Sequence, residues 1–176
     1  MDLKNKVRHV QDFPTPGIDF IDITPLLQNP DVFEYIINAF AEELSGIDFD
    51  LIVSSEARGF ILGTPLAYIL KKGFVPIRKK NKLPFDKISV GYDLEYGQDT
   101  LEMHADAVQP GQKVVIVDDI LATGGTLRAN IDLIEKSGGK VQKILFLIEL
   151  VNLNGRDKFT SGNNGGCYDI FSLEKI

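Results

Sequence analysis

The sequence predicts an α/β fold with a central, mostly parallel sheet flanked by helices. Short apolar runs alternate with stretches of helical periodicity, and the strand candidates are apolar throughout rather than at every second residue. Strands of this kind are typical of parallel sheets that helices cover on both faces. Because ligands of such sheets bind beyond the carboxyl ends of the strands, a binding site is expected at that edge.

Helices are expected where apolar residues recur at helical spacing, and strands where short apolar runs are bounded by glycine, proline or charge. The expected elements are helices over 31–45, 60–72 and 125–137, and strands over 51–54, 74–77, 114–117, 141–150 and 168–173. Asp31 is the expected N-cap of the first helix. Residues 88–108 suggest two exposed polar strands flanking Gly97-Gln98, and the polar, glycine-rich residues 154–166 suggest a mobile surface loop.

Composition favours one cytosolic domain, residues 1–176. The chain has 176 residues, of which 44% are hydrophobic, and the N-terminus has no apolar core like that of a secretory signal. No apolar run approaches the length that spans a membrane. A net charge of -6 argues against a broad nucleic-acid interface, and the single cysteine, Cys167, excludes an internal disulfide and a cysteine-based zinc site.

The stretch VVIVDDILATGGTL, residues 114–127, carries the most informative chemistry. Asp118 and Asp119 end an expected buried strand, where two carboxylates suit a vicinal diol such as the ribose hydroxyls, or the waters around a magnesium ion. The following residues offer unhindered N–H groups and two hydroxyls at a helix N-terminus, which suits a phosphate. These loop residues are Ala122, Thr123, Gly124, Gly125 and Thr126. A diol site beside a phosphate site indicates a ribose 5-phosphate.

This stretch closely resembles the signature of type I phosphoribosyltransferases, which bind 5-phosphoribosyl 1-pyrophosphate (PRPP). Three further stretches resemble the adenine phosphoribosyltransferases in particular, so that the resemblance covers roughly residues 11–153. They are FPTPGIDFIDITPLL at 13–27, SSEARGF at 54–60, and IRKKNKLP with SVGYDLEYGQDTLEMHADA in the region 77–107. The resemblance implies a base-binding hood segment at about 1–28 and a mobile two-stranded catalytic loop.

The second stretch resembles the family's pyrophosphate loop. Arg58 can donate a fork of two hydrogen bonds to phosphate oxygens, and the resemblance implies a strained Glu56–Ala57 peptide that turns an N–H towards pyrophosphate. Arg78, Lys79 and Lys82 are expected around the same group. Lys80 and Lys87 are expected in solvent.

The first and third stretches imply a base site and a catalytic loop. Phe20 would stack on adenine while backbone groups of Asp19 and Ile21 read its edge, and Leu121 joins this set. Ile21 departs from the commonest pattern of the family, which has a basic residue there. By resemblance, Glu95 is the base that accepts the purine proton and Tyr96 closes over the reacting atoms, with Arg58 completing the catalytic set.

The resemblance implies transfer of a phosphoribosyl group from PRPP to adenine, giving AMP and pyrophosphate, in a homodimer. The net charge and the lack of a membrane-length apolar run lead us to expect no nucleic-acid or membrane partner. Magnesium would bind with PRPP, and Asp118 and Asp119 would help through water. Two alternatives stay open at this point. One is an enzyme for another 6-substituted purine such as hypoxanthine, and the other is a PRPP-sensing regulator.

Overall fold

A computed structural model of the chain describes residues 1–94, 97–160 and 167–176. The helices in this part of the chain are η1 (Lys4–Lys6), α1 (Thr24–Gln28), α2 (Pro30–Glu43), α3 (Arg58–Leu70), α4 (Gly125–Lys136), η2 (Val151–Leu153) and α5 (Asp157–Thr160). The strands are β1 (Arg8–Gln11), β2 (Asp19–Asp22), β3 (Leu51–Ser55), β4 (Gly73–Lys79), β5 (Lys87–Leu94), β6 (Gly97–His104), β7 (Lys113–Leu121), β8 (Lys140–Glu149) and β9 (Ile170–Lys175). No described helix is long and apolar enough to cross a membrane.

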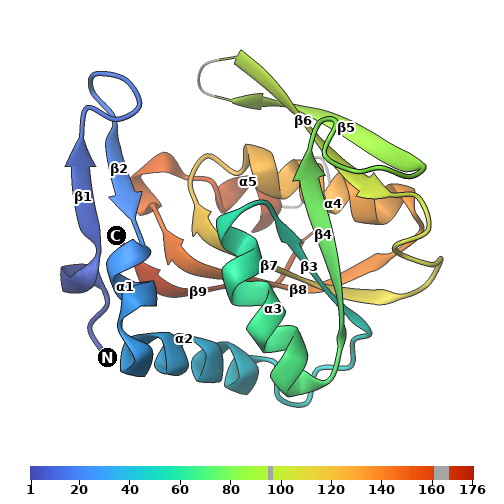
Figure 1. The fold of residues 1–176 in the computed structure, drawn as a ribbon, viewed down its shortest axis with the longest axis horizontal. Helices are drawn as coiled ribbons and strands as arrows, with labels where there is room; N and C mark the ends of the chain where they lie inside the picture. Colours follow the sequence, from blue (N-terminus) through green and yellow to red (C-terminus); the bar gives the residue numbers. More distant parts are fainter. Residues whose placement is uncertain (95–96, 161–166) are drawn as a thin grey trace.

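The main sheet has the strand order β5-β6-β4-β3-β7-β8-β9 (Figure 1). Its strands β4, β3, β7, β8 and β9 run parallel, whereas β6 pairs antiparallel with both β4 and β5. The strands β1 and β2 form a separate antiparallel pair at the N-terminal side of the molecule. The predicted parallel sheet is therefore confirmed, with an antiparallel arm at one edge.

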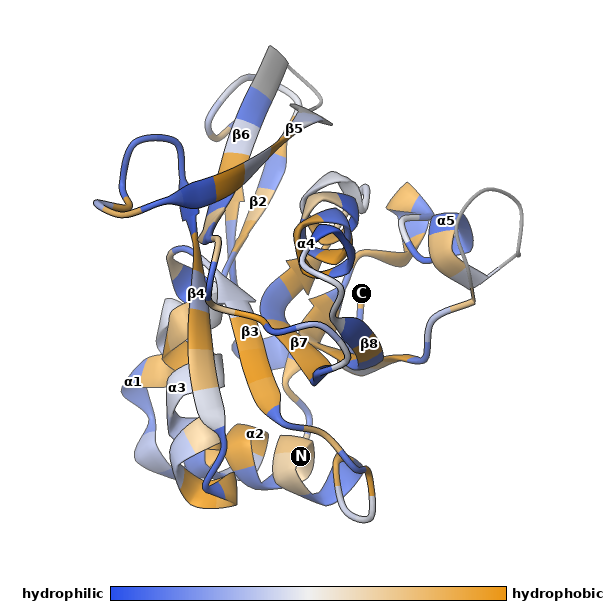
Figure 2. Ribbon diagram, turned by 90° about the vertical axis from the view of Figure 1, so that its right-hand side faces the viewer, coloured by the Kyte–Doolittle hydropathy of each residue, from blue (hydrophilic) through white to orange (hydrophobic). Residues whose placement is uncertain are grey.

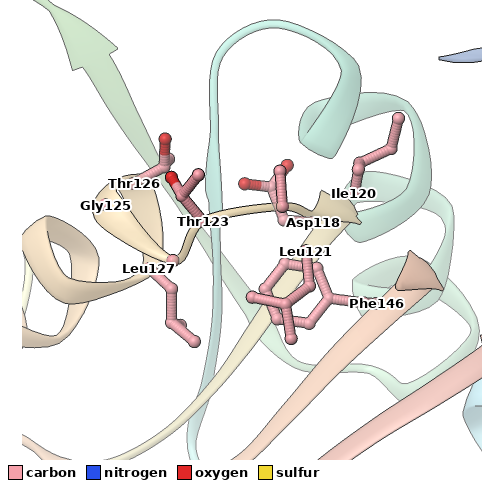
Figure 3. Close-up of a pocket in the computed structure, with 10 residues that line it drawn as sticks. Asp118, Ile120, Leu121, Thr123, Gly125, Thr126, Leu127 and Phe146 are labelled. Atoms are coloured by element: carbon pink, nitrogen blue, oxygen red, sulfur yellow. The ribbon is translucent and has the colours of Figure 1, made fainter. Parts of the chain in front are cut away.

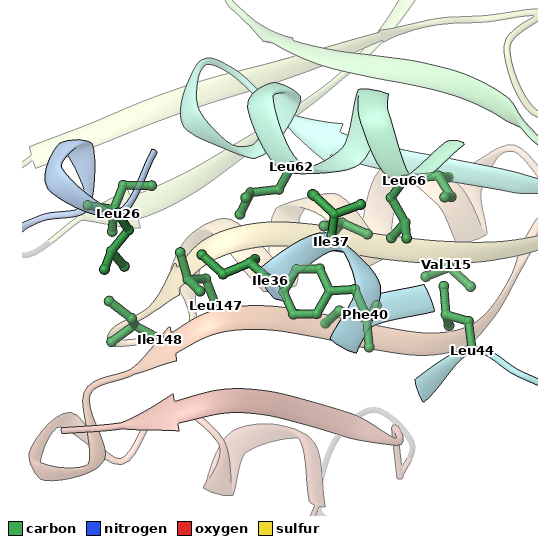
Figure 4. Packing of buried hydrophobic residues seen from close by; sticks show 14 of the residues in the cluster. Leu26, Ile36, Ile37, Phe40, Leu44, Leu62, Leu66, Val115, Leu147 and Ile148 are labelled. Atoms are coloured by element: carbon green, nitrogen blue, oxygen red, sulfur yellow. The ribbon is translucent and has the colours of Figure 1, made fainter. Parts of the chain in front are cut away.

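Two apolar layers cover the sheet. Helices α2 and α3 pack on one face through residues such as Ile36, Phe40 and Leu62, each of which is fully buried (Figure 4). Helix α4 packs on the other face through Ile131 and Ile134. In Figure 2 the ribbon of β3 is largely hydrophobic in colour, which agrees with burial on both faces.

Three local expectations were wrong. The N-cap of α2 is Asn29, whose Oδ1 accepts hydrogen bonds from the N–H groups of Asp31 and Val32, so Asp31 lies inside the first turn. The arm β5–β6 is not wholly exposed, because side chains such as Leu101 and Met103 are buried on one of its faces. The expected loop at 154–166 is not a plain loop in its first part, since residues 157–160 form α5 and Phe159 is buried; residues 161–166 lie outside the described residues.

Lys87 also differs from its expected place in solvent. Its Nζ lies 3.1 Å from Oε2 of Glu102, a carboxylate that is only 3% exposed at the base of the arm. The same oxygen accepts a hydrogen bond from the Asn81 N–H at 2.9 Å. Burial raises the pKa of Glu102, but the Lys87 ammonium and the Asn81 N–H outweigh burial and hold the pKa below its ordinary value.

Candidate active site

A cleft of about 1350 Å³ opens at the carboxyl edge of the parallel strands. It collects residues from β2, the β3–α3 turn, β4, β5, the β7–α4 turn and the chain after β8. The predicted site residues that line it are Asp19, Phe20, Ile21, Glu56, Ala57, Arg58, Lys79, Asp118, Asp119, Ala122, Thr123 and Thr126. Parts of the chain from His9 to Ile176 therefore meet at the edge where the fold class predicted a ligand.

Asp118 and Asp119 lie near the carboxyl end of β7 and are 7% and 6% exposed. Oδ1 of Asp118 accepts a hydrogen bond from the Asp119 N–H at 2.9 Å. Burial raises the pKa of Asp118 well above its usual range, and the charge of Asp119 adds to that effect. Burial also raises the pKa of Asp119, although the Arg58 guanidinium opposes the change. Two such carboxyl groups favour a ligand that donates hydrogen bonds or carries positive charge.

The turn after β7 forms a small pocket of about 60 Å³ next to the cleft. Ala122, Thr123, Gly124, Gly125 and Thr126 all line this pocket, and α4 begins at Gly125. Figure 3 shows the hydroxyls of Thr123 and Thr126 on the same side of the turn as the Asp118 carboxyl group. Gly124 has a φ of +85°, a left-handed conformation that favours glycine. Amide groups and hydroxyls at the start of a helix can bind a phosphate.

The β3–α3 turn brings Arg58 to the centre of the cleft. Its Nε lies 2.5 Å from Oδ2 of Asp119, and its guanidinium lies over the Phe20 ring with 5.1 Å between the guanidinium carbon and the ring centroid. The preceding Glu56–Ala57 peptide is cis. Arg58 side-chain atoms are 39% exposed, so the guanidinium can still reach an anion in the cleft.

The basic residues at the end of β4 and just after it lie in different places. Arg78 Nε donates to Oε2 of Glu56 at 2.7 Å, so its charge is bound at the back of the turn. Lys79 lines the cleft and lies 3.8 Å from Asp99 on the arm. Lys82 is exposed and does not line the cleft; its carbonyl accepts a hydrogen bond from Arg78 Nη1 at 3.4 Å.

The β1–β2 pair supplies the wall opposite the sheet. Phe20 is half-buried and lines the cleft, and Phe13 packs edge-on against it with 5.3 Å between the ring centroids. Asp19 also lines the cleft, and its carboxylate lies 2.7 Å from His9 Nδ1. Ile21 is 4% exposed and packs into the core, which leaves its backbone as the part available to a ligand.

Comparison with known proteins agrees with this geometry. A model of the phosphoribosyl transferase domain matches residues 22–162. Adenine phosphoribosyltransferase of Ruminiclostridium cellulolyticum is 60% identical over 166 residues, which cover 93% of this chain and 96% of the relative. The chain belongs to the adenine phosphoribosyltransferase family.

Solved structures of this family share the whole architecture. The adenine phosphoribosyltransferase of Thermoanaerobacter pseudethanolicus superposes with a TM-score of 0.92 and 53% identity, over 99% of this chain and 98% of that one. The Saccharomyces cerevisiae enzyme, solved with an imino-altritol bisphosphate and adenine, superposes with a TM-score of 0.87 and 38% identity, over 97% of this chain and 96% of that one.

Leu121, which was expected to contact adenine, does not line the cleft. It is 1% exposed, belongs to the core beneath α4, and lies beside Phe146 in Figure 3. Its neighbour Ile120 lines the cleft instead. Alternation along β7 places Ile120 on the same face as Asp118, but it also places Leu121 on the same face as Asp119, so the sequence pattern does not choose between them.

Two expected catalytic residues, Glu95 and Tyr96, lie outside the described residues. The strands that flank them are described, and the arm reaches the cleft through Tyr92, which lines it together with Thr126. Sequence reasoning missed Tyr92, and it also missed the wall formed by residues 150–153 and Ile176. No local motif marks that wall, since only the pairing of β8 with β9 brings its two parts together.

Proposed function

We propose that this protein transfers the 5-phosphoribosyl group of PRPP to adenine, giving AMP and pyrophosphate, as a step of purine salvage. The observation that carries the proposal is that one cleft joins an acidic pair and glycine turn on β7–α4 to Arg58 and to the Phe20 ring. These are the groups that a sugar phosphate, a pyrophosphate and a planar base require. The family's name and the adenine in the yeast complex support the choice of base.

The β7–α4 turn is the proposed ribose 5-phosphate site. Asp118 and Asp119 would accept hydrogen bonds from the two ribose hydroxyls, and the amides and hydroxyls of residues 122–126 would bind the phosphate. The fit is supported by Asp118, which lines the small pocket and whose carboxyl group lies beside the turn (Figure 3). Ribose hydroxyls donate hydrogen bonds, which suits carboxyl groups that burial has removed from water.

The β3–α3 turn and the end of β4 are the proposed pyrophosphate site. Arg58 and Lys79 reach the cleft with their side chains, and the Glu56–Ala57 peptide lines it. Arg78 holds Glu56 in place, and we assign it a supporting role on that ground. Lys82 would need to turn inward to contact the leaving group, because its side chain is exposed outside the cleft.

The proposed adenine site lies between the β1–β2 pair and the end of β7. Phe20 would stack on the ring, with Ile120 on the cleft wall formed by β7, and the backbone of Asp19 and Ile21 would read the ring edge. Because Ile21 is buried in the core, its side chain contributes apolar packing rather than the charge common in the family.

Catalysis is proposed to be chiefly positioning and charge neutralisation as pyrophosphate leaves the anomeric carbon. Glu95 is the proposed base for the purine proton, and Tyr96 the residue that closes over the reacting atoms. Closure of the arm would exclude water, which otherwise hydrolyses PRPP. Glu95→Gln is expected to lower kcat far more than it weakens PRPP binding, whereas equal losses in both would argue against a base.

Magnesium is part of the proposal. The described residues contain no group of three or more His, Cys, Asp or Glu side chains that could hold an ion, and the Asp118–Asp119 pair is what they offer at the proposed site. Such a pair fits an ion held mostly by substrate oxygens and water. When bound with PRPP, the ion would neutralise charge on the pyrophosphate.

A cytoplasmic homodimer is also proposed. Helix α3 exposes apolar side chains on its outer surface, where Ile61, Tyr68 and Ile69 are 43%, 84% and 44% exposed. A second copy of the chain would cover them. Light scattering after gel filtration is expected to give twice the chain mass, and Tyr68→Lys to shift the protein towards monomer.

A product assay tests the proposed function. The protein would be mixed with PRPP, Mg²⁺ and one of adenine, hypoxanthine or guanine, and the nucleotide formed would be separated by chromatography. AMP formation with little product from the other bases is expected. Product from hypoxanthine alone would assign another 6-substituted purine, and PRPP binding without any product would point to a sensor.

A further inference from the structure

The segment after β8, residues 154–160, packs directly against the glycine turn of residues 122–126. Gly155 is buried, and a Cβ added there would lie 2.0 Å from the Ala122 carbonyl oxygen and 3.1 Å from the Gly124 nitrogen. Both clashing atoms belong to the backbone, so neither could move aside cheaply. Glycine is therefore required at 155 by the close approach of two chain segments.

Phe159 holds the same turn from a second side. A Cβ added at Gly124 would lie 2.8 Å from a ring carbon of Phe159, which is 1% exposed. The aromatic ring thus fills the space beside the left-handed glycine, and it packs edge-on against Tyr168 with 6.4 Å between ring centroids. The shape of the turn depends on residues that lie more than thirty positions away.

Arg156 anchors this segment to the sheet. Its Nε donates to Glu149 Oε1 at 2.8 Å, Nη1 to the Ile170 carbonyl at 2.6 Å, and Nη2 to the Ser172 hydroxyl at 2.9 Å. The guanidinium thereby joins β8, β9 and the segment. Because Arg156 fixes the segment to the sheet, the segment can hold the glycine turn that it contacts in one position.

Lys158 makes a polar contact between the segment 154–160 and the glycine turn. Its Nζ donates a hydrogen bond to the Thr123 carbonyl oxygen at 2.7 Å. The C=O of a trans peptide and the N–H that follows it point in opposite directions, so this bond sets the direction of the Gly124 N–H. It also places an ammonium next to the turn assigned above to the dianionic 5-phosphate.

We infer that Lys158 is a positioning residue for the 5-phosphate of the substrate, and that residues 155–159 form a built-in support for the phosphate turn. The inference rests on the proposed function, which names that turn as the phosphate site. Lys158 acts through the Thr123–Gly124 peptide and through its charge, and it takes no part in the chemistry at the anomeric carbon. Its loss affects the ribose-phosphate end of the cleft and leaves the pyrophosphate and base ends unchanged.

Lys158→Met, with Lys158→Arg as the conservative variant, tests the inference. The matched control is Lys140→Met, which removes one exposed lysine at the opposite edge of the sheet. Binding of ribose 5-phosphate and of pyrophosphate would be measured separately by calorimetry, alongside steady-state AMP formation. Lys158→Met is expected to weaken ribose 5-phosphate about tenfold and to raise KM for PRPP similarly, with pyrophosphate affinity and kcat nearly unchanged.

Lys158→Arg is expected to restore most of the affinity, because it keeps a donor and a charge. The inference is overturned if Lys158→Met binds ribose 5-phosphate like the wild type, if it loses affinity for both probes equally, or if Lys140→Met behaves the same way. If the wild type forms AMP but Lys158→Met shows no selective loss of ribose 5-phosphate affinity, the role of Lys158 is rejected and the proposed function stands. Wild-type protein that forms no AMP from PRPP and adenine would reject the proposed function.

Discussion

Arg58 and Asp119 form an ion pair across the centre of the cleft, with 2.5 Å between Nε and Oδ2. The pair joins the turn after β3 to the end of β7, so it connects the proposed pyrophosphate and ribose sites. Asp119 is 6% exposed, and the guanidinium is the group that opposes the rise in its pKa caused by burial. The same guanidinium lies over the Phe20 ring. Arg58 therefore contacts parts of all three proposed subsites.

Arg58→Gln is expected to lower kcat/KM for PRPP by about 100-fold, because loss of a donor to developing charge costs about 3 kcal/mol. The substitution also leaves Asp119 buried without its cation. Arg8→Gln is the matched control, since Arg8 is 59% exposed and pairs with Asp22 outside the cleft at 3.3 Å. Initial rates of AMP formation would check this, and a rate for Arg58→Gln close to that of Arg8→Gln would exclude a role for Arg58.

Phe20→Ala is expected to raise KM for adenine about tenfold, because stacking of a base on an aromatic ring is worth about 1–3 kcal/mol. KM for PRPP should change much less, and Phe20→Tyr should restore adenine binding since it keeps the ring. Steady-state kinetics with each substrate varied in turn would measure the split. Equal rises in both KM values would mean that Phe20 shapes the cleft in general rather than the base site.

Gly59→Ala and Gly63→Ala together distinguish an effect on ligand binding from an effect on the stability of α3. A Cβ at Gly59 would lie 2.7 Å from Asp118 Oδ1, whereas one at Gly63 would meet Ser54 Oγ at 2.1 Å and a Phe74 ring carbon at 2.9 Å. Both changes overpack the interior and should cost about 1–3 kcal/mol of unfolding free energy. Only Gly59→Ala should also displace Asp118 and weaken ribose 5-phosphate binding. Thermal unfolding and calorimetry on both variants would show whether this difference exists.

The continuous apolar runs and the helical periodicity of the sequence predicted the parallel sheet, its helices and the edge where the cleft lies. Those patterns are local, because each buried strand needs its own apolar run. The approximate ends of α2 and α3 followed from the same patterns, but the N-cap did not. Asn29 and Asp31 are both good caps, and Pro30 suits the first helical position, which favours Asn29.

The remaining parts of the site depend on contacts between distant segments. The segment at 154–160 looked like a loop because its glycine and polar residues are those of a loop, yet Gly155 is needed for the approach to Ala122. Lys87 looked like a solvent-exposed charge because its partner, Glu102, lies on the opposite strand of the arm. The sequence also does not show that Ile120 rather than Leu121 lines the cleft, because the adjacent Asp118 and Asp119 both line it.

Glu149 and Arg156 should make stability depend on pH in acid. The Arg156 guanidinium holds the pKa of Glu149 below its ordinary value, against the opposing effect of burial. A carboxyl group with a depressed pKa in the folded state stabilises the protein above its unfolded pKa, which is about 4.3. That contribution is lost as the pH falls from there through the folded value.

Urea unfolding of wild type and Glu149→Gln between pH 7 and pH 3.5 would measure this contribution. The variant should be less stable at pH 7 by about 3 kcal/mol, because it removes one partner of a largely buried ion pair. The difference should shrink as the pH falls below the unfolded pKa. A difference that stays constant down to the lowest pH would show that the Glu149 charge does not contribute.

The most direct measurement of the central claim is the calorimetric comparison of ribose 5-phosphate with 2-deoxyribose 5-phosphate, on wild type and on a variant with Asp118→Asn and Asp119→Asn together. The acidic pair is proposed to hold both ribose hydroxyls beside the phosphate turn. Wild type should therefore bind ribose 5-phosphate about tenfold or more tightly than its 2-deoxy analogue, and the double variant should lose that preference while still binding phosphate. Equal binding of the two sugars by wild type, or a preference that survives in the double variant, would contradict the account.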